Sequence, residues 1–366
     1  MLKQLLVGIG GGMVVGFAGI WLVLALGGGG PIARVMGGVG IADVLALYLA
    51  LLTSITVHEL GHLVGGRLGG ARFLMFVVAP LRIVRTTKGL EASLVFNLGA
   101  IGGFAASMPD PERPLIRQLV PLIAGGPIAS LALAFGAALL APALSGRAEV
   151  WCGVLAAISA LLFLVSAIPT RIGGMWSDGR QLLDIARGGR GVEQRCLVTQ
   201  LYMENHAGVR PRDVDPRRLA QALDEVPGDI LFDIGTFAHA YAAALDAGRI
   251  DEAGRWLDRI EDVFERYPMG FRQALALELA YFEAAHRGNA ERARAWLAHA
   301  RGGITEPSRV ALADAALALV ERRDGDARAA LARCRAALRA PTSPGTAAMT
   351  ADQVSALEAK LATAAA

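Results

Sequence analysis

Thr53-Ser-Ile-Thr-Val-His-Glu-Leu-Gly-His-Leu-Val64 places a His-Glu-x-x-His motif inside an otherwise apolar run of the chain. On a helix, His58 and His62 project from the same face and Glu59 lies beside them. Two such histidines can bind a zinc ion, and the adjacent glutamate can act as a base. On a soluble helix the same residues could be a chance arrangement. Here they end a hydrophobic segment, where ionisable side chains are unfavourable unless they bind something, so the sequence favours a metal site.

The overall composition indicates that part of the chain lies in lipid. Of its 366 residues 54% are hydrophobic and 19% are charged, and the mean hydropathy is +0.44. These values are unusual for a soluble protein. The net charge of +3 and the lack of interleaved aromatic and basic residues give no support for a nucleic-acid partner. The three cysteines lie far apart without a C-x-x-C pair, which argues against a disulfide framework and a cysteine-ligated metal.

Four apolar segments are long enough to cross a bilayer, which predicts a mainly α-helical, polytopic membrane protein with about four transmembrane helices. They are residues 5–26, the run that begins near Ile41 and carries the motif, residues 118–146 and residues 150–170. The first segment could instead be a cleaved signal peptide. Its apolar run exceeds the usual length of about 7–15 residues, which favours a retained anchor.

The distribution of positive residues predicts the orientation in the membrane. Lysines and arginines cluster at Lys3, in residues 67–88, at 113 and 117 and in residues 171–190, whereas the other side keeps only Arg34 and Arg147. The positive-inside rule therefore places both termini and the metal end of the second segment in the cytoplasm. The arginine, alanine and glycine bias suggests a bacterial protein, and hence the bacterial inner membrane.

Between the second and third apolar segments the pattern changes to short runs. The runs within residues 73–104 are separated by Pro80 and by Lys88-Gly89, which suits strands better than a crossing helix. We therefore expect a small β-hairpin or sheet at the membrane face. Gly102-Gly103-Phe104 and Pro109–Pro114 are expected to close this region as loop.

A hydrolytic zinc site needs a third protein ligand besides the two histidines. Asp178 is the best candidate among the carboxylates near a membrane end. It lies 116 residues after His62, so the fourth apolar segment would have to fold back against the second. Aspartate is also a frequent N-cap, and Asp178 could serve only to start the helix that follows.

Residues 191–366 have the composition of a soluble helical domain, so we expect a membrane domain over residues 1–190 and a cytoplasmic domain after it. Ala253-x-x-x-Leu257 recurs as Ala293-x-x-x-Leu297, and more faintly as Ala327-x-x-x-Leu331. The offsets of 40 and 34 residues are near the period of tetratricopeptide-like repeats, which grip partner proteins. An irregular helical bundle is the alternative. The stretch from Pro341 to Gly345 and the alanine-rich end predict a loose tail.

These motifs together resemble the site-2 protease family of intramembrane zinc metalloproteases. The matching parts, within residues 41–187, are His58-Glu-Leu-Gly-His62, Gly126-Pro127-x-x-Ser130, and Pro169 followed by Asp178-Gly179. The resemblance implies one zinc ion held by His58, His62 and Asp178, with Glu59 as general base. It also implies that the hairpin presents the substrate as an added strand.

The chain departs from the family pattern at two places. Ser130 and Ser166 stand where the family commonly has asparagine, and Arg-Ile-Gly-Gly-Met lengthens the turn between Pro169 and Asp178. These departures concern the groups that hold substrate or oxyanion more than the metal.

The sequence as a whole predicts a zinc metalloendopeptidase that hydrolyses a peptide bond in or near the transmembrane segment of a membrane protein. Its expected partners are that substrate, the lipid bilayer and a protein bound by the C-terminal domain. The main alternative is a catalytically silent membrane scaffold that binds partners through its C-terminal repeats. A metal transporter would need polar residues along several helices, which the sequence lacks.

Overall fold

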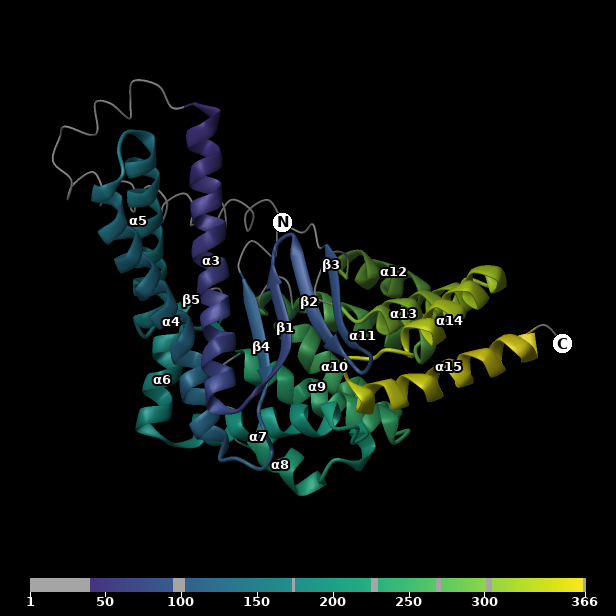
Figure 1. Cartoon of the computed structure of the whole chain (residues 1–366). Coiled ribbons are helices and arrows are strands. Elements are labelled where there is room, and N and C mark those ends of the chain that lie inside the picture. Colours follow the sequence, from purple (N-terminus) through teal and green to yellow (C-terminus); the bar gives the residue numbers. More distant parts are fainter. Residues whose placement is uncertain are drawn as a thin grey trace.

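Three long apolar helices stand side by side in the computed structural model, which describes residues 40–94, 103–172, 175–224, 230–267, 271–300 and 305–364 (Figure 1). They are α3 (Ile41–Gly69), α4 (Leu115–Leu140) and α5 (Arg147–Ala167). Each is long and apolar enough to cross a membrane, α4 together with the short turn η2 (Ala141–Ala143). They correspond to the second, third and fourth predicted segments. The first, residues 5–26, lies outside the described residues.

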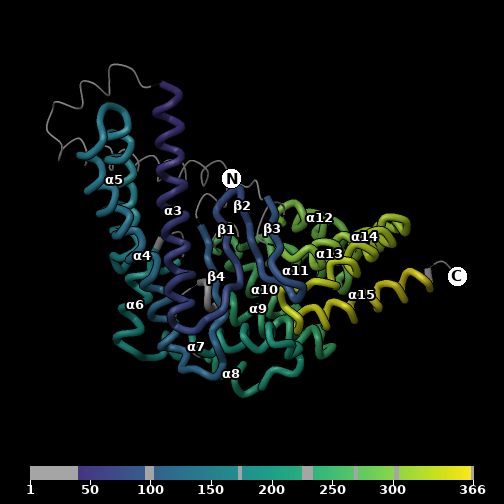
Figure 2. Tube along the Cα trace, in the orientation of Figure 1, coloured from purple at the N-terminus to yellow at the C-terminus, as the bar shows by residue number. Residues whose placement is uncertain are grey.

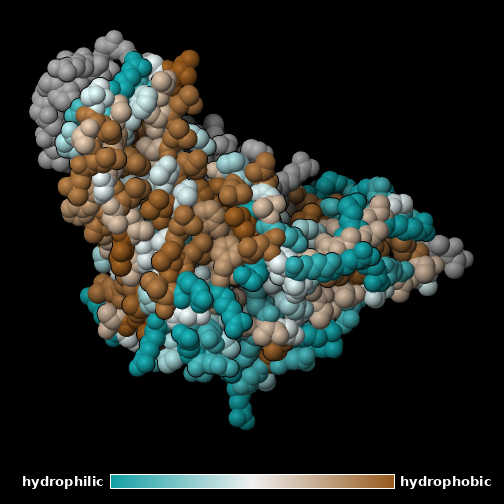
Figure 3. Space-filling view, in the orientation of Figure 1, coloured by the Kyte–Doolittle hydropathy of each residue, from teal (hydrophilic) through white to brown (hydrophobic). Residues whose placement is uncertain are grey.

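The outer surface of these helices is apolar. On α3, for example, Leu45 and Leu49 are each 56% exposed and Val64 is 59% exposed. Figure 3 shows mostly hydrophobic residues over the three helices, whereas most of the hydrophilic residues lie over the lower and right-hand parts of the molecule. An apolar surface of this extent is unfavourable in water and is typical of contact with lipid.

Small residues let α3 and α4 touch through their backbones. A Cβ atom added to Gly61 would overlap the carbonyl oxygen of Gly125, and one added to Gly125 would overlap that of Gly61. A Cβ at Gly65 would likewise overlap the carbonyl oxygen of Pro121. Such glycine contacts are typical of close helix pairs in membranes, and they hold the motif helix directly against α4.

Polar side chains tie α3 to α5. The hydroxyl oxygens of Ser54 and Ser159 lie 2.9 Å apart, and both side chains are fully buried. Near the start of α3, the Trp151 indole N–H donates to the Asp43 carboxylate at 3.0 Å. The fourth apolar segment therefore packs against the second, which is required if Asp178 is to reach the two histidines.

A four-stranded antiparallel sheet follows α3. Its strands are β1 (Arg72–Val78), β2 (Leu81–Thr86), β3 (Gly89–Leu94) and β4 (Phe104–Met108), in the spatial order β3-β2-β1-β4. The trace in Figure 2 shows the sheet between α3 and the C-terminal helices. The expected small sheet is thus confirmed.

The prediction of loop at Phe104 is wrong, because the chain there enters strand β4. The run Phe-Ala-Ala-Ser-Met lacks the alternation that marks a strand in sequence. It becomes a strand through its neighbours, since Ala105 pairs with Phe76 of β1. On α3, a Cβ at Gly66 would contact the side chain of Ser107. Tertiary pairing decides this element.

The lengthened turn after Pro169 forms a small hairpin. Strands β5 (Arg171–Ile172) and β6 (Met175–Trp176) pair antiparallel, with Arg171 opposite Trp176. Helices α6 (Asp178–Arg187) and α7 (Arg190–His206) follow.

The C-terminal region is helical throughout its described residues and is built largely from helix pairs. Its elements are η3 (Pro211–Asp213), α8 (Pro216–Asp224), α9 (Ile230–Asp246), α10 (Ile250–Val263), η4 (Phe264–Arg266), α11 (Arg272–Ala285), α12 (Ala290–His299), α13 (Pro307–Val320), α14 (Asp324–Ala337) and α15 (Pro344–Ala364). Within the series α9 packs on α10, α11 on α12 and α13 on α14.

The same turn joins each of these three pairs. The residue two places before the second helix has positive φ in every case: 74° at Gly248, 66° at Gly288 and 57° at Arg322. The alanines of the sequence repeat are fully buried in the second helices. Because arginine replaces glycine at the third turn, the third repeat is faint in the sequence. The tetratricopeptide assignment stays a prediction.

The predicted loose tail is wrong, because residues 344–364 form the packed helix α15. Val354, Leu357 and Leu361 are at most 5% exposed. Their spacing places them on one face, which packs on α13 and α14. The alanines around them favour helix rather than disorder. The domain boundary near residue 190 stays a prediction.

Candidate metal centre

The three motif residues lie on α3, well below the apolar outer surface. His58 is 7% exposed and Glu59 is 9% exposed. The Nε2 atoms of His58 and His62 are 3.2 Å apart. The one-turn spacing therefore brings the two imidazoles together, as expected from the sequence.

Asp178 reaches the same point from the start of α6. Its Oδ2 atom lies 3.4 Å from His58 Nε2 and 3.6 Å from His62 Nε2. Among the described residues, these three side chains form the one group of histidine, cysteine and carboxylate donors arranged to hold a metal ion. The structure thus brings together residues that are 116 positions apart in the chain.

Asp178 is not the N-cap of α6, because Ser177 has that position. The Ser177 hydroxyl accepts from the backbone N–H of Arg180 at 3.2 Å and donates to the Ile168 carbonyl at 2.7 Å. The backbone N–H of Thr170 also donates to it at 3.0 Å. The side chain of Asp178 is therefore not needed for capping and projects toward the histidines.

The extra residues in this turn do not displace Asp178. Those that the structure describes, Arg171, Ile172 and Met175, lie in strands β5 and β6, and the contacts of Ser177 with Ile168 and Thr170 join the two ends of this turn. A Cβ at Gly179 would overlap the carbonyl oxygen of Ala167. The start of α6 therefore lies directly against the end of α5, and only glycine fits after Asp178.

Each histidine is oriented through its second ring nitrogen. His62 Nδ1 lies 2.8 Å from the carbonyl oxygen of Leu122, which can only accept, so Nδ1 donates. His58 Nδ1 lies 2.9 Å from the Ser130 hydroxyl. When Nδ1 donates, Nε2 keeps its lone pair for a metal, which is the usual arrangement of a ligating histidine.

Helix α4 provides a matching face for the two rings. Gly126 and Ser130 are one turn apart, and a Cβ at Gly126 would overlap the His62 ring. The contact of Ser130 with His58 does not follow from the sequence motif, where Ser130 stands only for a family asparagine. Its one-turn spacing from Gly126 is the signal that places both residues on this face. Ser166, the second such serine, donates to Phe163 of its own helix at 3.2 Å.

Strand β4 lies against Glu59. A Cβ at Gly103 would overlap the Glu59 side chain, and the backbone of Ala105 interacts with its carboxyl group. Gly103 was expected only as part of a loop, with no functional role. The structure shows that the edge of the sheet and the carboxyl group of the motif are in contact.

The donor atoms fit a zinc ion. Ligand atoms bound to zinc at about 2.0–2.2 Å in a tetrahedron lie roughly 3.3–3.6 Å apart. The observed separations of the three donors are 3.2, 3.4 and 3.6 Å. Two neutral imidazoles and one carboxylate are also a donor set that zinc uses in hydrolytic enzymes, which keep a further position open.

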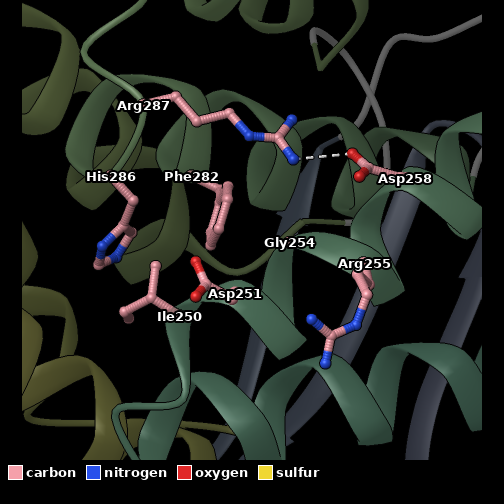
Figure 4. A pocket seen from close by; sticks show the side chains of 8 residues that line it. All are labelled: Ile250, Asp251, Gly254, Arg255, Asp258, Phe282, His286 and Arg287. Atoms are coloured by element: carbon pink, nitrogen blue, oxygen red, sulfur yellow. Dashed lines mark hydrogen bonds and ion pairs between the residues drawn. The ribbon is translucent and has the colours of Figure 1, made fainter.

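A separate hollow of about 210 Å³ lies in the C-terminal domain. Figure 4 shows Phe282, His286 and Arg287 on one side of it and α10 side chains on the other. Arg287 pairs there with Asp258 at 2.8 Å. The hollow is also lined by Asp251 and Arg255, so it carries two acidic and two arginine side chains.

Comparison with known proteins agrees with this geometry. Residues 46–352 match the model of peptidase family M50. The match includes the motif helix, Asp178 and most of the C-terminal helices. No curated protein and no solved structure matches the chain.

Proposed function

The chain belongs to peptidase family M50, a family of membrane metalloproteases, and from this premise we propose that it is an intramembrane zinc endopeptidase. Its substrate is a membrane protein that is cut in or near a transmembrane segment. In this proposal one zinc ion is held by His58, His62 and Asp178, and Glu59 is the general base.

The convergence of the three donor atoms beside Glu59 carries this proposal. They lie among helices whose outer surface is apolar. Ionisable groups in such surroundings are unfavourable unless they have a function. A scaffold that works only through its C-terminal helices would not need them.

The reaction needs few groups besides these. When bound, zinc supplies a Lewis acid that polarises the peptide carbonyl and makes water a nucleophile near neutral pH. Glu59 accepts the proton of the attacking water and passes it to the leaving amine. The scissile segment must be unwound first, because a helix engages its carbonyl groups in hydrogen bonds.

Strand β4 is the place where an unwound segment would bind. It is an edge strand of the sheet within the described residues, and β1 is its partner there. An extended peptide can pair with such an edge through main-chain hydrogen bonds. Because Gly103 and Ala105 adjoin Glu59, a peptide added to β4 would lie next to the general base.

The proposal is tested by comparing the purified wild type with Glu59→Gln on a library of transmembrane peptides, with zinc content measured in both. We expect equal zinc content and loss of cleavage by more than about a hundredfold in the variant, since a general base contributes about 10²–10⁴-fold. Equal cleavage by the two proteins would refute protease function. Bound zinc without cleavage in the wild type would favour the scaffold.

The role of Asp178 is tested separately by zinc stoichiometry. We expect Asp178→Ala to lose zinc. The control is Asp184→Ala on the same helix, which pairs with Arg180 at 3.0 Å and should retain the metal. Equal zinc content in the two variants would remove Asp178 from the ligand set.

A further inference from the structure

Strand β4 is in contact with both the motif helix and the C-terminal domain. The backbone at Gly103 and Ala105 adjoins Glu59, whereas the Phe104 side chain between them contacts Phe271 of the C-terminal domain. The strand next to the general base is therefore also in contact with the soluble helices.

The contact between β4 and the C-terminal domain is a pair of aromatic rings. The ring centroids of Phe104 and Phe271 are 4.8 Å apart with an interplanar angle of 76°. This edge-to-face arrangement is a favourable one for aromatic side chains. Phe271 also contacts Tyr267, with the ring centroids 6.4 Å apart.

Phe271 stands at the start of a well-packed helix. It is the residue directly before α11, and ten of the 14 residues of that helix are buried. Tyr267 is itself only 8% exposed. A ring that projects from such a position can fix its partner, because well-packed interiors resist deformation.

Other interactions between described residues of the sheet and the C-terminal domain act on other strands. The backbone N–H of Thr87 in the β2–β3 turn donates to the Pro341 carbonyl at 3.1 Å. Arg82 of β2 is attracted to Glu306, the residue before α13. These interactions act on β2 and the β2–β3 turn, whereas the Phe104–Phe271 pair acts on β4 itself.

We propose that Phe271 is a positioning residue for the protease, through which the C-terminal domain holds β4 against Glu59. This inference rests on the proposed function. Phe271 does not touch the reacting atoms. It acts through Phe104 on the backbone of Gly103 and Ala105, and through that backbone on the geometry between the general base and a peptide paired with β4.

The expected effect is on catalysis rather than on metal binding. A displacement of about 1 Å at the reacting groups can lower the rate about a hundredfold. Because β4 stays paired with β1, we expect a smaller loss, about tenfold in kcat for Phe271→Ala. Zinc content should not change, because His58, His62 and Asp178 are held by α3, α4 and α6.

The experiment uses the full-length protein in lipid nanodiscs and compares Phe271→Ala, Phe104→Ala, the double variant and Phe271→Tyr. Phe271→Tyr keeps the aromatic ring, so its kcat should stay close to that of the wild type. The double variant should lose no more than either single variant, since both remove the same contact. Additive losses, or an unchanged kcat in Phe271→Ala, would overturn the inference.

The matched control is Trp296→Ala. Trp296 forms an edge-to-face pair with Phe264 inside the C-terminal domain, with centroids 4.9 Å apart and an interplanar angle of 71°. The control removes a similar contact that does not involve the sheet. We expect a comparable fall in thermal stability but a kcat within about twofold of the wild type. A tenfold loss in this control would assign the effect of Phe271 to general destabilisation.

Hydrogen exchange supplies a readout that does not depend on cleavage. We expect Phe271→Ala to speed amide exchange in peptides that cover residues 103–108, and Trp296→Ala to leave it unchanged. If the wild type shows no Glu59-dependent cleavage, the proposed function fails, and exchange alone still decides whether Phe271 holds β4. Unchanged exchange in Phe271→Ala would overturn the inference.

Discussion

The hydroxyl of Ser130 lies 2.9 Å from His58 Nδ1 and orients the His58 ring. We predict that Ser130→Ala weakens zinc binding about 10–100-fold, as is typical when a ligating histidine loses its hydrogen-bond partner. The measurement is a competition titration with a chelator. Ser166→Ala is the control, because that hydroxyl bonds to its own helix, and its zinc affinity should equal that of the wild type. Equal affinities in both variants would remove Ser130 from the metal centre.

Gly126, like its neighbour Gly125, is a position on α4 where a side chain cannot be accommodated. A Cβ there would overlap the His62 ring, so Gly126→Ala should push the ring away from the other two donors. We predict a loss of zinc affinity of more than about tenfold, on the scale of a disturbed ligand. The same titration measures it.

Gly136→Ala on the same helix is the matched control. A Cβ at Gly136 has no atom within 4 Å among the described residues, and alanine favours helix over glycine. Zinc affinity and stability should therefore be unchanged or slightly higher. If both variant proteins bind zinc as tightly as the wild type, the close approach of α4 to His62 is not needed for zinc binding.

At the scale of the helices, the contact between α7 and α9 contains a half-buried histidine, His239. The His239 ring lies on Tyr202 with centroids 4.6 Å apart, and its Nε2 atom has no hydrogen-bond partner among the described residues. Burial, and to a smaller extent the charge of His206, lowers the pKa of His239 from 6.5 to about 4.

The lowered pKa gives a predicted pH dependence. The folded protein binds a proton at His239 more weakly than the unfolded chain, so this residue makes stability fall as the pH drops from about 6.5 to about 4. We predict that His239→Phe weakens this fall in melting temperature. His299→Gln is the control at an exposed position, and its acid profile should match the wild type. Identical profiles for all three proteins would contradict the prediction.

The repeated turns explain why only part of the helical repeat pattern could be recognised in the sequence. Glycine marks the left-handed position at Gly248 and Gly288, so these two repeats could be recognised. Arg322 adopts the same conformation without the glycine signal. Helix α15 was not predicted, because proline, glycine and alanine suggested a loose tail. Its few large apolar residues are enough to stabilise the helix because they pack on α13 and α14.

At the scale of the whole molecule, the metal end of α3 and the C-terminal helices lie on the same side of the three apolar helices (Figure 1). Arg147 begins α5 at the opposite end, since Ala167 at its other end adjoins α6. From the positive-inside rule we predict that the side with the C-terminal helices faces the cytoplasm.

Cysteine labelling in a cysteine-free background tests this orientation. We predict that Arg147→Cys is labelled from outside intact cells by an impermeant reagent. Arg294→Cys, on α12, should be labelled only after the membrane is opened. Permeabilised cells serve as the control, in which both sites must react. The reverse pattern would invert the orientation.

The sequence by itself determined the apolar helices, the small sheet and the pair of histidines with Glu59. These features depend on local composition and on periodicities of a few residues, which are set before the chain folds. Family motifs also indicated Asp178, but left open whether it was a helix cap.

Only the tertiary structure decided which groups surround the motif. It gave the capping role to Ser177, brought Asp178 within 3.4 Å of His58 Nε2, and placed Ser130 against the same ring. It also made a strand of Phe104–Met108 and set it between Glu59 and Phe271. Apart from the local cap, these contacts join residues from 44 to 167 positions apart, and no local pattern specifies them, because they exist only once the helices and strands have packed.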